Sequence, residues 1–164
     1  SKSSAIAGAL GSMDEINSYL GLCKVKAKES GFKVTEDGPS FEELLHSIQQ
    51  DLFIVQAELA GAPKKIEEGK LKELESIIKL IESELPPIRT FFISGGTELA
   101  AHFDFARTVA RRAERRVVAV QEEGKIVPSD HTMAYLNRLS SILFALARLS
   151  NHKSGIKEEP PSYK

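Results

Sequence analysis

The chain has 164 residues, of which 41% are hydrophobic and 27% are charged, and its formal net charge is −1. This length suits one domain with a sizeable core, and the charge balance argues against a disordered tail or a general affinity for nucleic acid. The one cysteine, Cys23, excludes an intrachain disulfide framework and fits a reducing compartment. The longest apolar run, residues 142–147, is far shorter than the roughly 20 residues that span a bilayer. We therefore expect a soluble, cytoplasmic protein with no membrane partner.

Five segments repeat apolar residues at helical spacing, and prolines separate them. The fifth has the widest apolar stripe, which favours a central position in the fold. Thr97 and Ser129 precede the fourth and fifth segments and are predicted N-caps. In chain order, the segments cover approximately residues 4–28, 45–59, 71–85, 99–120 and 130–152.

This pattern predicts an all-α fold, a single up-and-down bundle of five helices. Alternating strand patterns bounded by hairpin turns do not occur in the sequence. We expect the bundle domain to occupy residues 1–154 and residues 155–164 to form a polar C-terminal tail.

The strongest local signal is an arginine run in the fourth segment. Five of the eight arginines lie within ten residues, at positions 107, 111, 112, 115 and 116. On a helix they form two adjacent stripes, in which like charges one turn apart repel each other. Guanidinium groups offer a rigid fork of donors to phosphate, so the run predicts an anion site, such as one for a polyphosphate. The alternative interpretation is a solvated basic face.

Four other polar residues are expected to point inward. Asp14 and Asn17 lie one turn apart in the first segment, and Asn137 and Arg138 lie in the apolar fifth segment. Buried polar groups need hydrogen-bond partners, which here are either the arginine stripe or ordinary core groups.

Two phenylalanines, Phe91 and Phe92, form an aromatic tip on the loop between the third and fourth segments. We expect this loop to cover a pocket. A di-iron site in a helical bundle needs two Glu-x-x-His motifs, whereas this chain has only Glu43-x-x-His46. That motif is therefore interpreted as surface, and no metal ligand is assigned.

Three runs of this sequence resemble the PduO-type ATP:cob(I)alamin adenosyltransferases. They are Gly11-Ser-Met-Asp-Glu-Ile-Asn17, the stretch from Phe92 to Val118 that contains the arginine run, and the stretch from Tyr135 to Arg148. The resemblance covers nearly the whole chain, and the arginine run is its most specific part. It implies a homotrimer of five-helix bundles with active sites between neighbouring subunits.

The resemblance further implies transfer of the 5′-deoxyadenosyl group of ATP to the cobalt of cob(I)alamin, with Mg²⁺, giving adenosylcobalamin and triphosphate. Cobalt(I) is itself the nucleophile, so no catalytic triad is expected, and arginines stabilise the charge of the leaving triphosphate. A reductase and an adenosylcobalamin-dependent enzyme are candidate partners, and no nucleic acid is expected. By motif position, the implied ATP-binding residues are Lys2, Arg111, Arg112, Glu114, Arg115 and Asn137. The implied catalytic residues are Asp14, Arg107, Arg111 and Arg112, and the implied cobalamin-binding residues are Phe91 and Phe92.

The sequence departs from the family's pattern at Ser94, Asp104 and Ser141, where the family has Pro, His and Asp. The family's phosphate loop, Thr-Gly-Asp-x-Gly-x-Thr, is expected upstream of Lys2. Two interpretations therefore stay open: an adenosyltransferase, and a non-catalytic nucleotide-binding trimer that has lost the phosphate loop. A nucleic-acid-binding bundle is a weaker third, because no aromatic platform accompanies the arginines and Glu114 lies among them.

Overall fold

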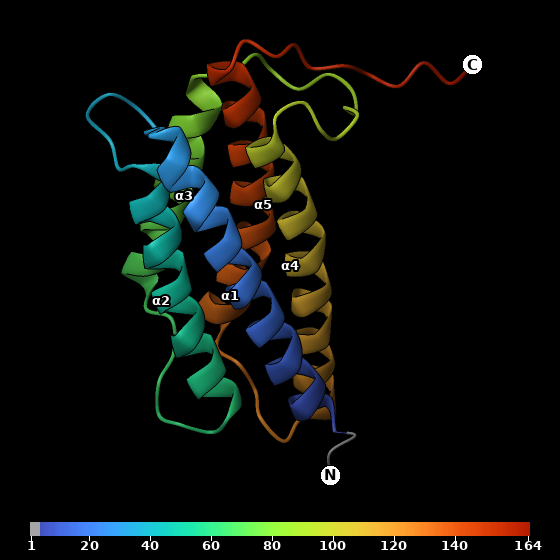
Figure 1. Ribbon diagram of the computed structural model, residues 1–164. Coiled ribbons are helices and arrows are strands. Elements are labelled where there is room, and N and C mark those ends of the chain that lie inside the picture. Colours follow the sequence, from blue (N-terminus) through green and yellow to red (C-terminus); the bar gives the residue numbers. More distant parts are fainter. Residues whose placement is uncertain (1–3) are drawn as a thin grey trace.

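The computed structural model describes residues 4–164, which form an up-and-down bundle of five helices in a single domain (Figure 1). This arrangement confirms the predicted all-α fold, while Lys2 lies outside the described residues. Within them, the only extended pairing is an isolated bridge between Lys33 and Ser40. The helices are α1 (Ala5–Ser30), α2 (Phe41–Leu59), α3 (Glu68–Ser83), α4 (Glu98–Glu123) and α5 (Asp130–Lys153).

Local side-chain caps explain where most of the helices begin. In four of them a serine or threonine oxygen accepts a hydrogen bond from a backbone N–H of the first turn, which would otherwise lack a partner. At the start of α2, Glu43 completes a capping box. The predicted caps of α4 and α5 are confirmed. The four capping residues are Ser4, Ser40, Thr97 and Ser129.

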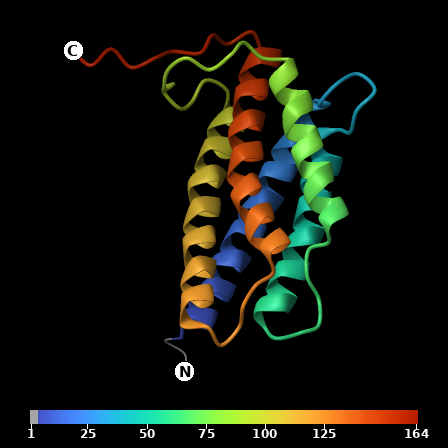
Figure 2. The ribbon, with the colours of Figure 1, turned by 180° about the vertical axis from the view of Figure 1, so that it is seen from behind.

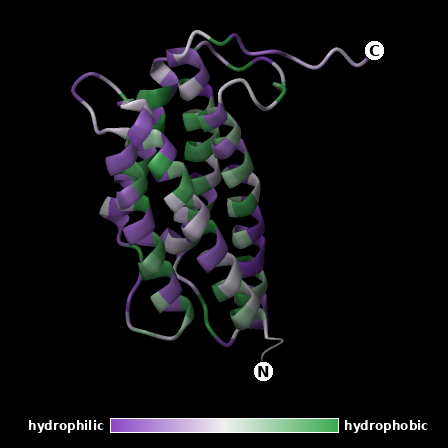
Figure 3. Ribbon diagram, in the orientation of Figure 1, coloured by the Kyte–Doolittle hydropathy of each residue, from purple (hydrophilic) through white to green (hydrophobic). Residues whose placement is uncertain are grey.

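The core lies around α5, which packs between α4 and α3 (Figure 2). Leu139, Ile142, Leu143 and Leu146 of α5 are completely buried, which confirms its predicted central position. Along each ribbon, hydrophilic and hydrophobic residues alternate as expected of amphipathic helices (Figure 3). In residues 4–164 we find no helix with both the length and the hydropathy needed to cross a bilayer.

A buried polar network joins three of the helices. The hydroxyl of Tyr135 on α5 donates a hydrogen bond to Oδ2 of Asp51 on α2, at 2.8 Å. Nζ of Lys70 on α3 lies 2.9 Å from the other oxygen of this carboxylate. Burial, together with the charge of Asp51, raises the pKa of Tyr135 well above its ordinary value. Tyr135 therefore stays a protonated donor, and its hydroxyl ties α5 to α2.

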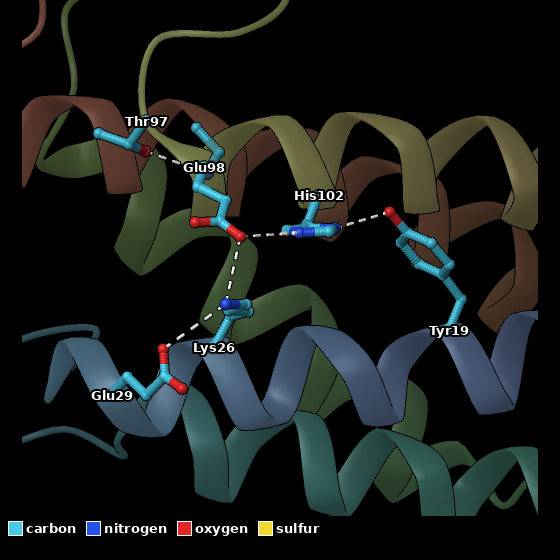
Figure 4. Close-up of polar contacts among 7 residues, drawn as sticks. Tyr19, Lys26, Glu29, Thr97, Glu98 and His102 are labelled. Atoms are coloured by element: carbon cyan, nitrogen blue, oxygen red, sulfur yellow. Dashed lines mark hydrogen bonds and ion pairs between the residues drawn. The ribbon is translucent and has the colours of Figure 1, made fainter.

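A second polar cluster joins α1 to α4 (Figure 4). The Tyr19 hydroxyl lies 2.8 Å from Nδ1 of His102, and Oε1 of Glu98 lies 3.6 Å from the other ring nitrogen. Nζ of Lys26 lies 3.2 Å from the same Glu98 oxygen and 3.8 Å from Glu29. The hydrogen bond from Lys26 lowers the pKa of the Glu98 carboxyl. These contacts fix the rotation of α4 against α1, and this rotation decides which way the arginine run faces.

We expect Tyr135→Phe to lower the free energy of unfolding by about 1.5–3 kcal/mol, because it leaves a buried Asp51 oxygen without its donor. Urea denaturation at fixed protein concentration measures the change. Tyr163→Phe is the matched control, since Tyr163 is 83% exposed and its change should stay within about 0.5 kcal/mol. Equal stability of the two variants would contradict this role for the network.

Candidate functional site

The end of the bundle at which α4 begins and α5 ends holds a cleft of about 880 Å³. Its walls are the loop before α4, the first half of α4, the second half of α5 and the chain that follows α5. The loop contributes the aromatic tip, Phe91 and Phe92, and α4 contributes Arg107 and Arg111. Two features that were predicted separately from the sequence therefore meet in one place.

The arginine run divides between two faces of α4. Arg107 and Arg111 line the cleft, one helical turn apart. Arg112 turns toward α1 and forms an ion pair with Glu15 there. Successive positions of an α-helix point about 100° apart, which explains why Arg111 and Arg112 reach different surfaces. Helix α4 thus offers guanidinium groups both to the cleft and to the α1 side.

Arg107 presents a nitrogen without a partner in the cleft. Its Nε is buried and makes no hydrogen bond within residues 4–164. The nearest carboxylate oxygen, Oδ1 of Asp104, lies 3.8 Å away, which is too long for a hydrogen bond. The guanidinium carbon lies 5.9 Å from the centre of the Phe144 ring, which supports the planar group from α5. The Arg107 side chain as a whole is 30% exposed, so an anion or a carboxylate from outside this chain can reach the guanidinium group at atoms other than the enclosed Nε.

The three departures from the family's pattern, Ser94, Asp104 and Ser141, all line the cleft. The Asp104 carboxyl lies beside Ser94 and Gly95 of the loop, which line the cleft with it. Burial raises the pKa of the Asp104 carboxyl, although Arg107 and these polar neighbours act in the opposite direction. Where the pattern has an acid on α5, this chain has an acid on α4 instead.

A second contact between α4 and α5 joins two residues of the predicted nucleotide-binding set. Nδ2 of Asn137 donates to Oε2 of Glu114 at 3.0 Å. Arg138 donates to the Asn137 side-chain oxygen at 3.0 Å and pairs with Glu75 of α3 at 3.1 Å. Arg115, also in the predicted set, is exposed and forms no ion pair within the described part of the chain.

The expectation that four polar residues point inward is wrong for three of them. Asp14 is exposed on the solvent side of α1. On α5, Asn137 is exposed and Arg138 is half-exposed, because even the wide apolar stripe leaves one side of the helix to solvent. Asn17 alone is buried, at 6% exposed, and it exchanges hydrogen bonds of 3.3 and 3.1 Å with Gln49 of α2. It is therefore a core residue and contacts no arginine of α4.

Sequence reasoning missed Arg148, which is only 6% exposed on α5. Its Nε and Nη2 both bond the carboxylate of Glu158, and Nη2 also donates to the Pro86 carbonyl at 2.8 Å. Its guanidinium carbon lies 5.4 Å from the centre of the Phe92 ring. The available signal was a cation inside an apolar run, since a buried charge requires a partner.

Asn151, also missed, fixes the turn that leads into α4. Its Nδ2 donates to the Gly95 carbonyl at 2.9 Å, and its Oδ1 accepts from the backbone N–H of Thr97 at 3.0 Å. Gly96 has a φ of +94°, and a Cβ on it would lie 2.5 Å from the Asn151 oxygen. Only glycine fits this close approach.

The remaining chemistry-bearing residues have structural explanations. Burial raises the pKa of the Cys23 thiol to about 12, which makes it a poor nucleophile. Glu43 caps α2, and the exposed His46 lies 3.3 Å from Lys24, as the surface interpretation of this pair expects. No group of three or more His, Cys, Asp or Glu in residues 4–164 is arranged to hold a metal ion.

A family model described as cobalamin adenosyltransferase matches residues 1–150 of the chain. Corrinoid adenosyltransferase PduO of Citrobacter freundii is 40% identical over 151 residues, which are 88% of this chain and 42% of that protein. The corrinoid adenosyltransferase of Bacillus subtilis strain 168 is 39% identical over 153 residues, which are 89% of this chain and 74% of that protein. The chain thus spans less than half the length of the first of these relatives.

Solved structures of the PduO-type ATP:corrinoid adenosyltransferase from Lactobacillus reuteri are similar over almost the whole chain. A phenylalanine-to-alanine variant, solved with cobalamin and ATP, aligns with a TM-score of 0.84 and 28% identity, covering 98% of this chain and 88% of that one. An arginine-to-lysine variant, solved with ATP, aligns with a TM-score of 0.83 and 29% identity, covering 98% and 89%.

Proposed function

The chain belongs to the cobalamin adenosyltransferase family, and we propose that it transfers the 5′-deoxyadenosyl group of ATP to the cobalt of cob(I)alamin. The products are adenosylcobalamin and triphosphate. The observation that carries the proposal is the cleft, in which an aromatic tip faces Arg107 and Arg111. A relative of matching fold was solved with both cobalamin and ATP, which supports these substrates.

In the proposed reaction, cobalt(I) attacks C5′ of ATP and forms a cobalt–carbon bond. The bond from C5′ to oxygen breaks, and its electron pair leaves with the triphosphate. Arg111 and Arg112 bind the phosphates and stabilise this charge, and Glu114 with Asn137 completes the nucleotide-binding set. Lys2 belongs to the same set. No side chain needs to act as the nucleophile.

The proposal places Mg²⁺ on the phosphate oxygens of ATP. Mg²⁺ keeps several waters and is commonly held by substrate phosphates with one or two carboxylates, so a dedicated protein cage is not required. Glu114, beside Asn137 and within the arginine run, is a carboxylate that fits such a site. When bound, Mg²⁺ neutralises part of the phosphate charge.

The proposal includes a homotrimer with the active sites between subunits. Helix α4 offers arginines to the cleft on one side and to the α1 side on the other, and Asp14 lies exposed on α1. In a closed ring, one subunit's α1 side meets the cleft side of the next subunit, so both sets of arginines reach one nucleotide. Phe105, 57% exposed and packed against Tyr19, supplies an apolar contact for this interface.

The proposed setting is the reducing cytoplasm, which suits a chain with one unpaired cysteine. A reductase that supplies cobalt(I), and an enzyme that uses adenosylcobalamin, are the partners that the reaction requires.

One observation favours a second candidate function, nucleotide binding without transfer. All three departures from the family's pattern line the cleft, so turnover is the property they would affect.

We expect Arg111→Ala and Arg112→Ala each to abolish detectable ATP binding. Each change removes a guanidinium group that donates paired hydrogen bonds to phosphate, a geometry that water does not reproduce. Isothermal titration calorimetry with ATP measures the affinity. Lys72→Ala on α3 is the control, since it removes one surface charge whose one ion pair within residues 4–164 is with Glu68. Wild-type affinity in both arginine variants would exclude the assignment.

We expect Asp14→Ala to weaken both trimer assembly and activity. Asp14 forms no ion pair within residues 4–164, and the Arg107 side chain is 30% exposed with its nearest carboxylate oxygen there 3.8 Å away, so the proposal pairs them across subunits. Removing one member of a partly buried pair often costs about 3–5 kcal/mol. Sedimentation at micromolar concentration measures assembly, with the exposed Asp37→Ala as control. A monomeric wild-type protein contradicts the trimer.

We expect Phe91→Ala to leave ATP affinity nearly unchanged and to lower sharply the rates of cobalt(II) reduction and adenosylation. Phe91 is 78% exposed and lines the cleft, where its ring can occupy the lower axial position of cobalt and exclude water. Spectroscopy of the ATP complex should also lose the signature of four-coordinate cobalt(II). If the signature persists in Phe91→Ala but vanishes in Phe92→Ala, the role belongs to Phe92.

A further inference from the structure

Arg148 lies outside the residues assigned to nucleotide and cobalamin binding, and its guanidinium group makes hydrogen bonds, an ion pair and an aromatic contact. Its side chain, 6% exposed, contacts both the loop between α3 and α4 and the tail, residues 155–164. Pro86 and Phe92 come from the two parts of the loop, and Glu158 comes from the tail. Because Arg148 itself stands on the rigid, central α5, it holds the loop and the tail to the core of the bundle.

The bond to Glu158 is the strongest of these contacts. Two guanidinium nitrogens reach the two oxygens of one carboxylate, the bidentate geometry in which such pairs bind best. Glu158 is itself largely buried, at 22% exposed in its side chain, so little solvent screens the pair. Removing the charge on either side leaves the other charge poorly compensated.

This ion pair makes the tail part of the cleft. The tail runs beside the loop before α4 in both ribbon views (Figures 1 and 2), and the backbone N–H of Ile93 donates to the Glu159 carbonyl at 2.8 Å. Lys157, Glu158 and Tyr163 line the cleft together with Phe91. The sequence predicted a polar tail here, and the structure gives that tail a specific place.

We infer that Arg148 is a positioning residue for the corrinoid: its ion pair with Glu158 and its contact with Phe92 hold the aromatic tip and the tail in one arrangement around the cleft. The inference rests on the proposed function. Phe91 is largely exposed and has no packing of its own to fix it, so its position follows from that of its neighbour Phe92. The ATP-binding arginines contact neither Glu158 nor Phe92, so ATP affinity should not depend on this ion pair.

The test compares Glu158→Gln with Glu159→Gln. Both remove one negative charge from the tail, but the Glu159 side chain is exposed and forms no ion pair in residues 4–164. Hydrogen exchange followed by mass spectrometry measures the protection of the backbone amides in the loop. The amide of Ile93 should exchange faster in Glu158→Gln only. Thermal unfolding of each variant establishes that it is folded.

The functional measurements are the affinities for ATP and for cob(II)alamin in the presence of ATP, together with the four-coordinate cobalt(II) signature. We expect Glu158→Gln to weaken cob(II)alamin binding roughly tenfold and to reduce the signature, as for the loss of one charge-assisted hydrogen bond. ATP affinity should stay within about twofold. Glu159 lines the cleft but forms no ion pair in residues 4–164, so Glu159→Gln should change corrinoid affinity and the signature much less than Glu158→Gln. Arg148→Lys, which keeps the charge but loses the fork, should behave like Glu158→Gln.

Two results would overturn the inference and leave the proposed function standing. One is wild-type corrinoid affinity and signature in Glu158→Gln, and the other is an equal loss of ATP and corrinoid affinity, which indicates a general structural role. A wild-type protein that binds ATP but no cob(II)alamin would overturn the proposed function, and the positioning role with it.

Discussion

The arginine run can belong to a packed helix only because the residues between the arginines are small. Ala106, Ala110 and Ala113 form the buried seam of α4, and none is more than 1% exposed. This seam lets α4 approach its neighbours closely, while the long guanidinium side chains stay on the flanks, where water or an anion solvates them. A narrow apolar seam leaves two charged flanks, one beside α5 and one beside α1. The division of the arginines between the cleft and the α1 side follows from this constraint.

Side chains on the helices also determine where the non-helical loop of the cleft lies. The aromatic tip lies in chain without helix or strand, and ordering such a chain costs conformational entropy. Two polar side chains of α5, Arg148 and Asn151, offset this cost. Each bonds a different part of the loop. The rigid bundle thereby determines the geometry of a segment that has little packing of its own.

The fold was largely predictable, because helical periodicity and proline breaks are local properties of the sequence. The apolar pattern predicts the start of α2 about four residues late, because two glutamates lie between the buried Phe41 and Leu44 of its first turn and the pattern does not identify Ser40 as the cap. For the site, residue type and spacing identified Phe91 and Arg107, whose roles in the proposed reaction stay predictions. The partner of Arg148 was not predictable, because a salt bridge to Glu158 depends on the path of the tail, which no periodic pattern describes. The direction in which polar side chains face was also not predicted correctly. A wide apolar stripe does not determine which polar residues of the helix lie outside it, and Asn137 is one that does.

The close approach of Gly96 to Asn151 has a consequence for how this family of sequences can diverge. Any side chain at position 96 would meet the Asn151 amide well inside van der Waals contact, and the backbone there already has a positive φ. Asn151 in turn bonds both ends of this turn, through the Gly95 carbonyl and the Thr97 amide. The two positions therefore behave as one inherited unit. Relatives that keep an amide at the position of Asn151 are expected to keep glycine at that of Gly96, and the positive φ disfavours a side chain there even where the amide is lost.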